Sequence, residues 1–591
     1  MPTLTIDGRS VECAPGATII EAALQNDIDV PHFCWHPALS VSGNCRMCLV
    51  EVEKVGKLAI ACSTLAADGQ VVHVNNDRAT RAREAIMEFL LINHPLDCPI
   101  CDEAGQCKLQ DYAFEHGRGE SRFREVKEHK EKRVMLGPNV VFDAERCISC
   151  SRCIRFADEI GEQPVLTFVQ RGDHVTIQTF PGTELDNPYA MNVIDICPVG
   201  ALTSRDFRFK ARVWDMSFNE SVCPGCSRGC NVHVGVRNNE ILRLEARTNM
   251  KVNGYWMCDP GRLEEYPPVN VNRVDRPVIT GSLERREATW EEAHAELATR
   301  LKEFKPGEIA VLASPHATCE ENYALARFAR ETLNARMVSV ASYNDPSFAD
   351  AKLRTADRSA NSRGVRETVG EKNLTSFDQL VHGIRSGHIR ALVSLDDRLS
   401  VDNEIASVLG QLGFLAVFAS NWTPLAERAH LVLPRSTWAE QEGTFVNVEG
   451  TVQHIFPTVT TAENLRQMGM RMSRLDQFGA PNDRWTHGER RHCRPAWQTL
   501  SAVAKAMGNT KINYLWAEDV FEEIVAANPN FKAMSYEGLD TYRGMTLGRG
   551  DRPEAHGWEY RPHDFRPQIM PETAVLGVEE SGQRDVVDPK F

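Results

Sequence analysis

The distribution of cysteine constrains this chain more than any other feature. Sixteen of its 18 cysteines lie before residue 260, and only Cys319 and Cys493 lie beyond it. The N-terminal stretch MPTLTIDGRSVECAPG has neither the basic start and apolar core of a secretory signal nor the Arg- and Ser-rich composition of a transit peptide. We therefore expect a reducing compartment, in which thiols bind metal instead of pairing as disulfides. The first part of the chain is predicted to carry metal chemistry.

Length and charge narrow the class of protein further. At 591 residues the chain is too long for a single core, so roughly three to five domains are expected. A formal net charge of −14 argues against a nucleic-acid-binding protein. No apolar run approaches the roughly 20 residues that a membrane-spanning helix needs. If the protein works at a membrane, partner subunits must hold it there.

The first set of candidate ligands follows a hairpin and a helix. Asp7-Gly8 between alternating apolar residues predicts a tight hairpin, and Thr18 with Glu21 predicts a capping box that opens a helix. A strand, CLVEVE, is predicted to begin within the cysteine run, which suggests a small β-grasp ferredoxin whose four thiolates suit a 2Fe–2S cluster. A four-cysteine zinc site stays open for this module alone. The spacing is C-x10-C-x2-C-x13-C, at Cys34, Cys45, Cys48 and Cys62.

The second set contains a histidine. A predicted helix, RATRAREAIMEFLLINH, ends at His94, and three cysteines follow it with the spacing H-x3-C-x2-C-x5-C. We interpret His94 as the fourth ligand of a 4Fe–4S cluster, because the four groups could converge on one point with no thiolate to spare. A neutral imidazole in place of a thiolate should raise the reduction potential of that cluster. A zinc site with the same ligands and a bystander histidine remain alternatives. The cysteines of this set are Cys98, Cys101 and Cys107.

The third and fourth sets are built from cysteine alone. CISCSRC contains the C-x2-C-x2-C run of bacterial ferredoxins, and Cys197 in ICPVGAL is the predicted fourth ligand because Ala157 occupies the usual position. The fourth set has the spacing C-x2-C-x3-C-x27-C, which fits either 4Fe–4S or zinc. Together, 15 cysteines and one histidine complete four sets, for which 14 irons are predicted. The remaining ligands are Cys147, Cys150 and Cys153 in the third set and Cys223, Cys226, Cys230 and Cys258 in the fourth.

The four sets in this order resemble the large iron–sulfur subunit of proton-pumping NADH:quinone oxidoreductase, respiratory complex I, which in bacteria is called the G subunit. The resemblance covers nearly the whole chain. It implies one 2Fe–2S cluster in the first set and three 4Fe–4S clusters in the others. It also implies that electrons enter at the first set, cross the third and leave from the second. The fourth set is implied to lie off this path and to have a structural role.

Alternating strands and helices follow from about residue 273. Buried strands are predicted at GEIAVLAS, IRALVSLDD and FLAVFAS, and helices at CEENYALARFARETLNA, SFDQLVHGI and NEIASVLGQLG. This pattern predicts a parallel sheet with crossover helices. The predicted fold class is therefore α+β ferredoxin-type iron–sulfur modules at the N-terminus, followed by an α/β domain resembling a degenerate molybdopterin oxidoreductase. The predicted domains are 1–77 (β-grasp), 78–118 (second set), 138–210 (third set), 216–272 (fourth set) and 273–591 (α/β domain with an extended tail).

The C-terminal half is expected to hold no cofactor. It lacks G-x-G-x-x-G after a strand and lacks a P-loop, so NADH and FMN should be bound by another chain. LPRSTWAEQEGTFVNVEGTVQ resembles molybdopterin oxidoreductases, but no ligand loop for molybdenum is present, so no molybdenum is expected. Three alternatives are kept: an iron–sulfur subunit of an NAD-linked formate dehydrogenase, the same subunit of a hydrogenase, and a scaffold held together by zinc.

The resemblance also implies partners and a location. The partners are other complex I subunits, including the flavin/NADH-binding subunit and the downstream iron–sulfur subunits, and nucleic acid is not expected. The location implied is peripheral, on the cytoplasmic side of the bacterial inner membrane, held by partner subunits. Residues 466–494 carry seven arginines against three acidic residues, which fits either a solvated loop or a docking patch. The tail from Arg552, rich in proline and aromatic residues, is predicted to be extended.

Overall fold

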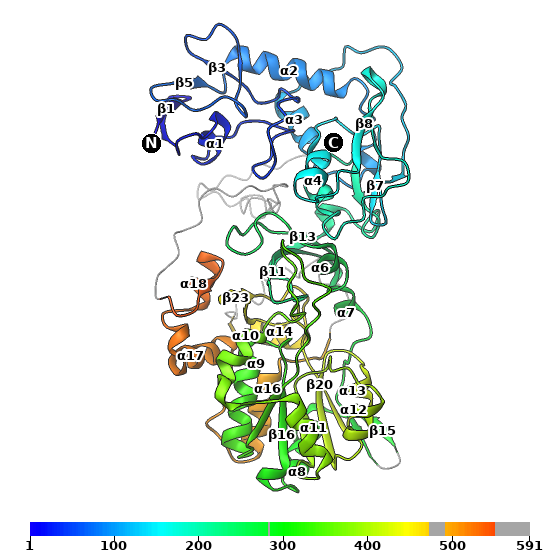
Figure 1. Cartoon of the computed structure of the whole chain (residues 1–591), viewed down its shortest axis with the longest axis vertical. Helices are drawn as coiled ribbons and strands as arrows, with labels where there is room; N and C mark the ends of the chain where they lie inside the picture. The colour runs from blue at the N-terminus through cyan, green and yellow to red at the C-terminus, as the bar shows by residue number, and fades with distance from the viewer. Residues whose placement is uncertain (282–283, 472–490, 550–591) are drawn as a thin grey trace, which may run out of the picture.

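The computed structural model describes residues 1–281, 284–471 and 491–549. Small ligand-bearing modules form one end of the molecule and an α/β body forms the other, with β13 and α6 between them (Figure 1). Predictions that concern most of the arginine-rich loop and the C-terminal tail fall outside the described residues. In the part of the chain that is described, no helix is long and apolar enough to cross a membrane.

The first module is a sheet with the strand order β2-β1-β5-β3-β4, packed on one short helix. β1 and β5 are parallel and the other pairs are antiparallel. The predicted hairpin is present, with φ of 46° at Asp7 and 81° at Gly8, and so is the capping box of Thr18 and Glu21. The elements are β1 (Thr3–Ile6), β2 (Arg9–Glu12), α1 (Ile19–Leu24), β3 (Leu49–Val52), β4 (Ala59–Ile60) and β5 (Val71–His73).

The second module is helical. α2 ends at Leu91 rather than at His94, because Pro95 disfavours the helical conformation in the residue before it. His94 therefore lies in the loop that leads to the cysteines. The elements are α2 (Asp77–Leu91), the 3-10 turn η1 (Cys98–Ile100) and α3 (Lys108–His116).

The third module combines two small antiparallel sheets with two helices. Its strand orders are β10-β7-β6 and β8-β9. α4 begins within the cysteine run and contains Cys153, and α5 ends two residues before Cys197. The elements are β6 (Val134–Met135), β7 (Val140–Phe142), α4 (Arg152–Glu159), β8 (Leu166–Val169), β9 (Thr176–Thr179), α5 (Asn192–Asp195) and β10 (Leu202–Ser204).

The fourth module is a three-stranded antiparallel sheet, β11-β12-β13, followed by two short helices. The ligand loop connects β11 to β12, and Cys258 caps α6. The elements are β11 (Ser217–Val222), β12 (Asn231–Arg237), β13 (Glu240–Ala246), α6 (Asp259–Leu263) and α7 (Pro267–Asn270).

The α/β body contains an eight-stranded sheet with the order β15-β14-β21-β20-β19-β16-β17-β18. The strands from β21 to β18 are all parallel, as the alternating pattern predicted. Its strands are β14 (Val278–Thr280), β15 (Arg285–Glu287), β16 (Ile309–Ala313), β17 (Met337–Val340), β18 (Leu374–Ser376), β19 (Ala391–Ser394), β20 (Phe414–Ala419) and β21 (Leu431–Pro434). The crossover helices are α9 (Cys319–Arg327), α10 (Ser362–Val365), α11 (Phe377–Arg385), α12 (Asn403–Leu409) and α13 (Pro424–Glu427).

Two further groups of elements complete the body. α8 and α16 pack together in the largest hydrophobic core, and a small sheet with the order β22-β23-β24 lies beside α17 and α18. These elements are α8 (Trp290–Leu301), β22 (Gly443–Val446), β23 (Thr451–Ile455), α14 (Ala462–Arg471), α16 (Ala496–Ala506), α17 (Ala517–Ala527), α18 (Tyr536–Tyr542) and β24 (Met545–Thr546).

Candidate metal centres

The first set of cysteines converges beside the β-grasp sheet. The Cys34 backbone N–H donates to the Cys45 sulfur at 3.4 Å. Hydrogen bonds from the Cys45 and Cys62 thiols lower the pKa of Cys34 to about 2, and a bond to Cys62 lowers the pKa of Cys48. The four sulfurs thus form one continuous group. Cys13 is buried in the core of the same module and is not one of the four predicted ligands.

The second set is more open. Cys101 and Cys107 are buried, whereas Cys98 is exposed. Burial and the charges of Lys127 and Arg146 lower the pKa of His94 to about 4, which favours the neutral imidazole that a metal ligand must be. Arg146 also interacts with the charge of Cys101, so His94 and Cys101 lie near the same guanidinium.

All four cysteines of the third set line one cavity of about 20 Å³. Ser149 and Ser151 in the loop have φ of 53° and 63°, a left-handed conformation that is uncommon outside glycine. The remaining wall is largely apolar and includes Phe142 and Ile177. Burial raises the pKa of the Cys197 thiol well above its usual value, so thiolates here need a metal to be stable.

Two cysteines of the fourth set lie against Gly261. A Cβ at Gly261 would lie 3.1 Å from the Cys223 sulfur and 3.2 Å from the Cys258 sulfur. The Gly261 N–H donates to the Cys258 sulfur at 3.4 Å, and the Cys223 N–H donates to the Cys230 carbonyl at 2.8 Å. Burial raises the pKa of Cys223 and Cys230, with further contributions from the other cysteines of the set, including Cys226.

The third module touches both the first and the second. Arg152 donates to the Trp35 carbonyl at 2.6 Å, and Arg155 donates to the Cys34 carbonyl, next to the first set. On the other side, a Cβ on Gly200 would overlap the Cys101 sulfur of the second set. The third ligand set therefore lies between the other two.

The spacing of the ligand atoms favours clusters over zinc. Zinc holds thiolates at about 2.3 Å, which places tetrahedral sulfurs about 3.8 Å apart. Among the described residues, only Glu128, Asp173 and His174 bring three candidate ligand atoms within 4.8 Å of one another. A 4Fe–4S cluster offers one iron to each of its four ligands and holds them farther apart, so the wider spacing of the second, third and fourth sets fits it.

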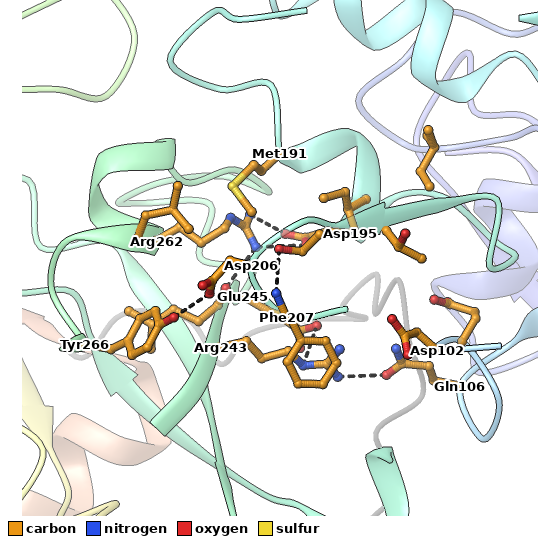
Figure 2. A pocket seen from close by; sticks show the side chains of 17 residues that line it. Asp102, Gln106, Met191, Asp195, Asp206, Phe207, Arg243, Glu245, Arg262 and Tyr266 are labelled. Atoms are coloured by element: carbon orange, nitrogen blue, oxygen red, sulfur yellow. Dashed lines mark hydrogen bonds and ion pairs between the residues drawn. The ribbon is translucent and has the colours of Figure 1, made fainter. Parts of the chain in front are cut away.

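A cavity of about 40 Å³ lies where the second, third and fourth modules meet. Arg262 donates to both Asp195 oxygens, at 2.9 and 2.6 Å, and Arg243 donates to Gln106 at 2.9 Å (Figure 2). Buried Glu245 forms an ion pair with Arg243 at 3.2 Å. These charges tie the fourth module to the ligand loops of the other two.

Sequence analysis did not identify Arg152, Arg155, Arg243 or Gly200. Each acts on a ligand loop that is distant in sequence, so no local spacing marks it. Of these residues, only Gly200 has a local signal in the sequence, because it lies three residues after the predicted ligand Cys197. A glycine beside a predicted ligand often marks close approach by another backbone or ligand.

Five family models match the chain, and each covers one module or part of the body. Their descriptions are 2Fe-2S iron-sulfur cluster binding domain (1–77), NADH-ubiquinone oxidoreductase-G iron-sulfur binding region (83–122), NADH-quinone oxidoreductase subunit 3, ferredoxin-like domain (137–203), Molybdopterin oxidoreductase Fe4S4 domain (216–263) and Molybdopterin oxidoreductase (360–468). Binding domains for 2Fe–2S and 4Fe–4S clusters are therefore present, and the predicted fold class is confirmed.

Curated relatives extend this result. The G subunit of NADH-quinone oxidoreductase from Rickettsia bellii (strain RML369-C) is 38% identical over 358 residues, which are 61% of this chain and 51% of the relative. The NADH-ubiquinone oxidoreductase 75 kDa subunit of Reclinomonas americana is 41% identical over 305 residues, 52% of this chain and 44% of the relative. The chain is similar to about half of the G subunit of NADH-quinone oxidoreductase. The predicted resemblance is thereby confirmed, and the chain matches about half the length of these relatives.

A solved structure is also similar to part of this chain. It is the NAD+-reducing NiFe-hydrogenase in the H2-reduced state, with 32% identity over 36% of this chain and 91% of its own. The TM-score of this likeness is 0.33.

Proposed function

We propose that this chain relays single electrons through iron–sulfur clusters as the G-type subunit of a respiratory NADH:quinone oxidoreductase. The observation that supports it best is the contact of the third ligand set with both neighbours. Arg155 reaches the carbonyl of Cys34, and Gly200 lies against the sulfur of Cys101. Three sets in an unbroken row suit a path for electrons that runs from the first set through the third to the second.

The proposed cofactors are one 2Fe–2S cluster and three 4Fe–4S clusters. When bound, these clusters accept and release one electron at a time. FMN and molybdenum are not part of the proposal for this chain. The ligands are Cys34, Cys45, Cys48 and Cys62 for 2Fe–2S; His94, Cys98, Cys101 and Cys107; Cys147, Cys150, Cys153 and Cys197; and Cys223, Cys226, Cys230 and Cys258 for the three 4Fe–4S clusters.

The residues of the chain would hold these groups, shield them and set the charge around them. Phe142 and Ile177 exclude water from the third set, which lowers the local dielectric constant. Electrostatic interactions with nearby charges are therefore stronger there. Arg152 and Arg155 hold the Cys34 loop against that set. His94, with its lowered pKa, offers a neutral nitrogen without first releasing a proton.

The proposed partners are a flavin/NADH-binding subunit before the first set and an iron–sulfur subunit after the second. Other subunits would hold the chain at the cytoplasmic side of the membrane. In this arrangement NADH and quinone are bound by other chains, and the proposed domains of this chain are the five predicted from its sequence.

Iron analysis and low-temperature EPR of the anaerobically isolated, dithionite-reduced protein test the proposal. We expect 14 irons per chain in four clusters. Cys45→Ser should abolish the 2Fe–2S signal and, in the assembled complex, NADH oxidation by quinone. Cys13→Ser is the matched control, because Cys13 is buried in the same module but outside the ligand group, and it should keep both. A colourless, iron-free native protein would contradict the proposal.

A further inference from the structure

A guanidinium from the fourth module reaches the ligand loop of the second. Arg243 lies on β13, and its Nη2 donates to the Gln106 side chain at 2.9 Å, next to Cys107 in sequence. The two residues are 137 positions apart. Figure 2 shows Arg243 directed towards Gln106 and Asp102, away from the Arg262 pair. A residue of one cluster module thus contacts the ligand loop of another.

The sheet is built to hold this side chain. Arg243 pairs with Gly235 across β12 and β13, and a Cβ at Gly235 would come within 3.1 Å of the Arg243 stem. The guanidinium carbon lies 4.5 Å from the ring centre of Phe207 and 5.1 Å from that of Phe218. Only 12% of the side chain is exposed. The positive charge is therefore fixed in place and largely removed from solvent.

The Nε side of the Arg243 guanidinium pairs with buried Glu245 at 3.2 Å, and its Nη2 donates to Gln106 in the loop of the second set. Of the residues that line the shared cavity, Arg243 and Arg262 carry positive charge, and Arg262 is engaged by Asp195 beside the third set. Gln106 lies between Cys101 and Cys107, so its hydrogen bond with Arg243 holds the guanidinium beside this ligand loop.

We propose that Arg243 is a positioning residue that raises the reduction potential of the cluster held by the second set. This inference rests on the proposed function. A reduced cluster carries one more negative charge than an oxidised one, so a fixed cation beside it stabilises the reduced state. Because the cation is poorly solvated, water screens this attraction little. The fourth module would thus assist the electron path through charge, although its own cluster lies off that path.

The test is a potentiometric titration of the purified, assembled complex, followed by EPR. The second-set signal is identified as the one that Cys107→Ser removes. Arg243→Gln should shift the midpoint potential of that signal to lower values and leave the first-set signal unchanged. Arg243→Lys, which keeps the charge, should restore most of the wild-type potential. Arg237→Gln is the control, because Arg237 lies on the same sheet with 37% of its side chain exposed and pairs at 3.8 Å with Asp215.

The outcomes separate this inference from the proposed function. Absence of cluster signals in the wild-type complex overturns the proposed function. Normal signals with no shift in Arg243→Gln overturn the inference alone, as do equal shifts in the Gln and Lys variants. If the Arg243→Gln complex loses the second-set cluster, the Arg243→Lys complex tests whether the charge of Arg243 sets the potential. Wild-type potential in that variant supports the role of charge, and loss of the cluster with the charge retained overturns it.

Discussion

Two ligand loops approach each other closely at a single glycine. Gly200 follows the Cys197 ligand and lies directly against the Cys101 sulfur, where a Cβ has no room. The neighbouring Pro198 carbonyl accepts from the Lys108 N–H at 3.1 Å, which fixes the third-set loop against the start of α3. The lack of a side chain at Gly200, more than its backbone conformation, is what permits this close contact.

Gly200→Ala is therefore expected to displace the Cys101 sulfur and to weaken or broaden the second-set EPR signal. The first-set signal should survive, since the atoms nearest to a Cβ at this position belong to the second set's loop. Gly56→Ala is the matched control, because a Cβ at Gly56 would meet nothing within 4 Å. Unchanged second-set spectra in Gly200→Ala would show that this loop moves freely.

Local signals predicted the first module well, whereas contacts between modules lay beyond them. Asp7-Gly8 and the Thr18 capping box depend on neighbours within three residues, so the pattern alone identifies them. The ligand spacings likewise depend on short stretches of sequence, and the four ligand sets that they predict stay predictions. The contact of Arg243 with Gln106 spans 137 residues, and no local pattern pairs two such side chains. His94 falls between these cases, because Pro95 ends the helix early but leaves it near Arg146.

Among the elements, α9 carries a buried acid into the core of the α/β body. Its capping box begins at Thr318, as an ordinary helix start does. Glu320 in the first turn is fully buried and accepts from the Thr444 N–H at 2.8 Å and the Tyr536 hydroxyl at 3.0 Å. Burial raises the pKa of Glu320 from 4.5 to about 7, even though these hydrogen bonds oppose the rise.

This shift predicts a pH dependence of stability. The native carboxyl keeps its proton up to about pH 7, whereas the unfolded one releases it near 4.5. The Glu320 carboxyl therefore contributes about 3 kcal/mol to the free energy of unfolding below pH 4.5, and this contribution is lost as the pH rises to about 7. When the free energy of unfolding is measured in urea at several pH values, it should fall less with rising pH in Glu320→Gln than in the wild type. Glu291→Gln, at an exposed first-turn acid of α8, should keep the wild-type slope. Equal slopes in all three proteins would contradict the assignment.

At the scale of the whole molecule, the fourth module joins the cluster-bearing end to the α/β body (Figure 1). Asn192 of the third module exchanges two hydrogen bonds with the backbone of Met257, at 2.8 and 3.1 Å, just before Cys258. The ring of Trp256 stacks on His36 of the first module, with centroids 5.2 Å apart. The loop that bears Cys258 therefore contacts two other modules, and the cluster that shapes it would brace them.

Cys226→Ser should consequently affect assembly more than electron flow. Loss of one ligand loosens the fourth set, and with it the contacts of Asn192 and His36. We expect less assembled complex, measured by its yield after size-exclusion chromatography, with the first three cluster signals preserved in the fraction that assembles. NADH:quinone activity per assembled complex should remain near the wild-type value, because the row of sets linked by Arg155 and Gly200 bypasses Cys226. A Cys226→Ser complex that assembles fully yet passes no electrons would place the fourth set on the path.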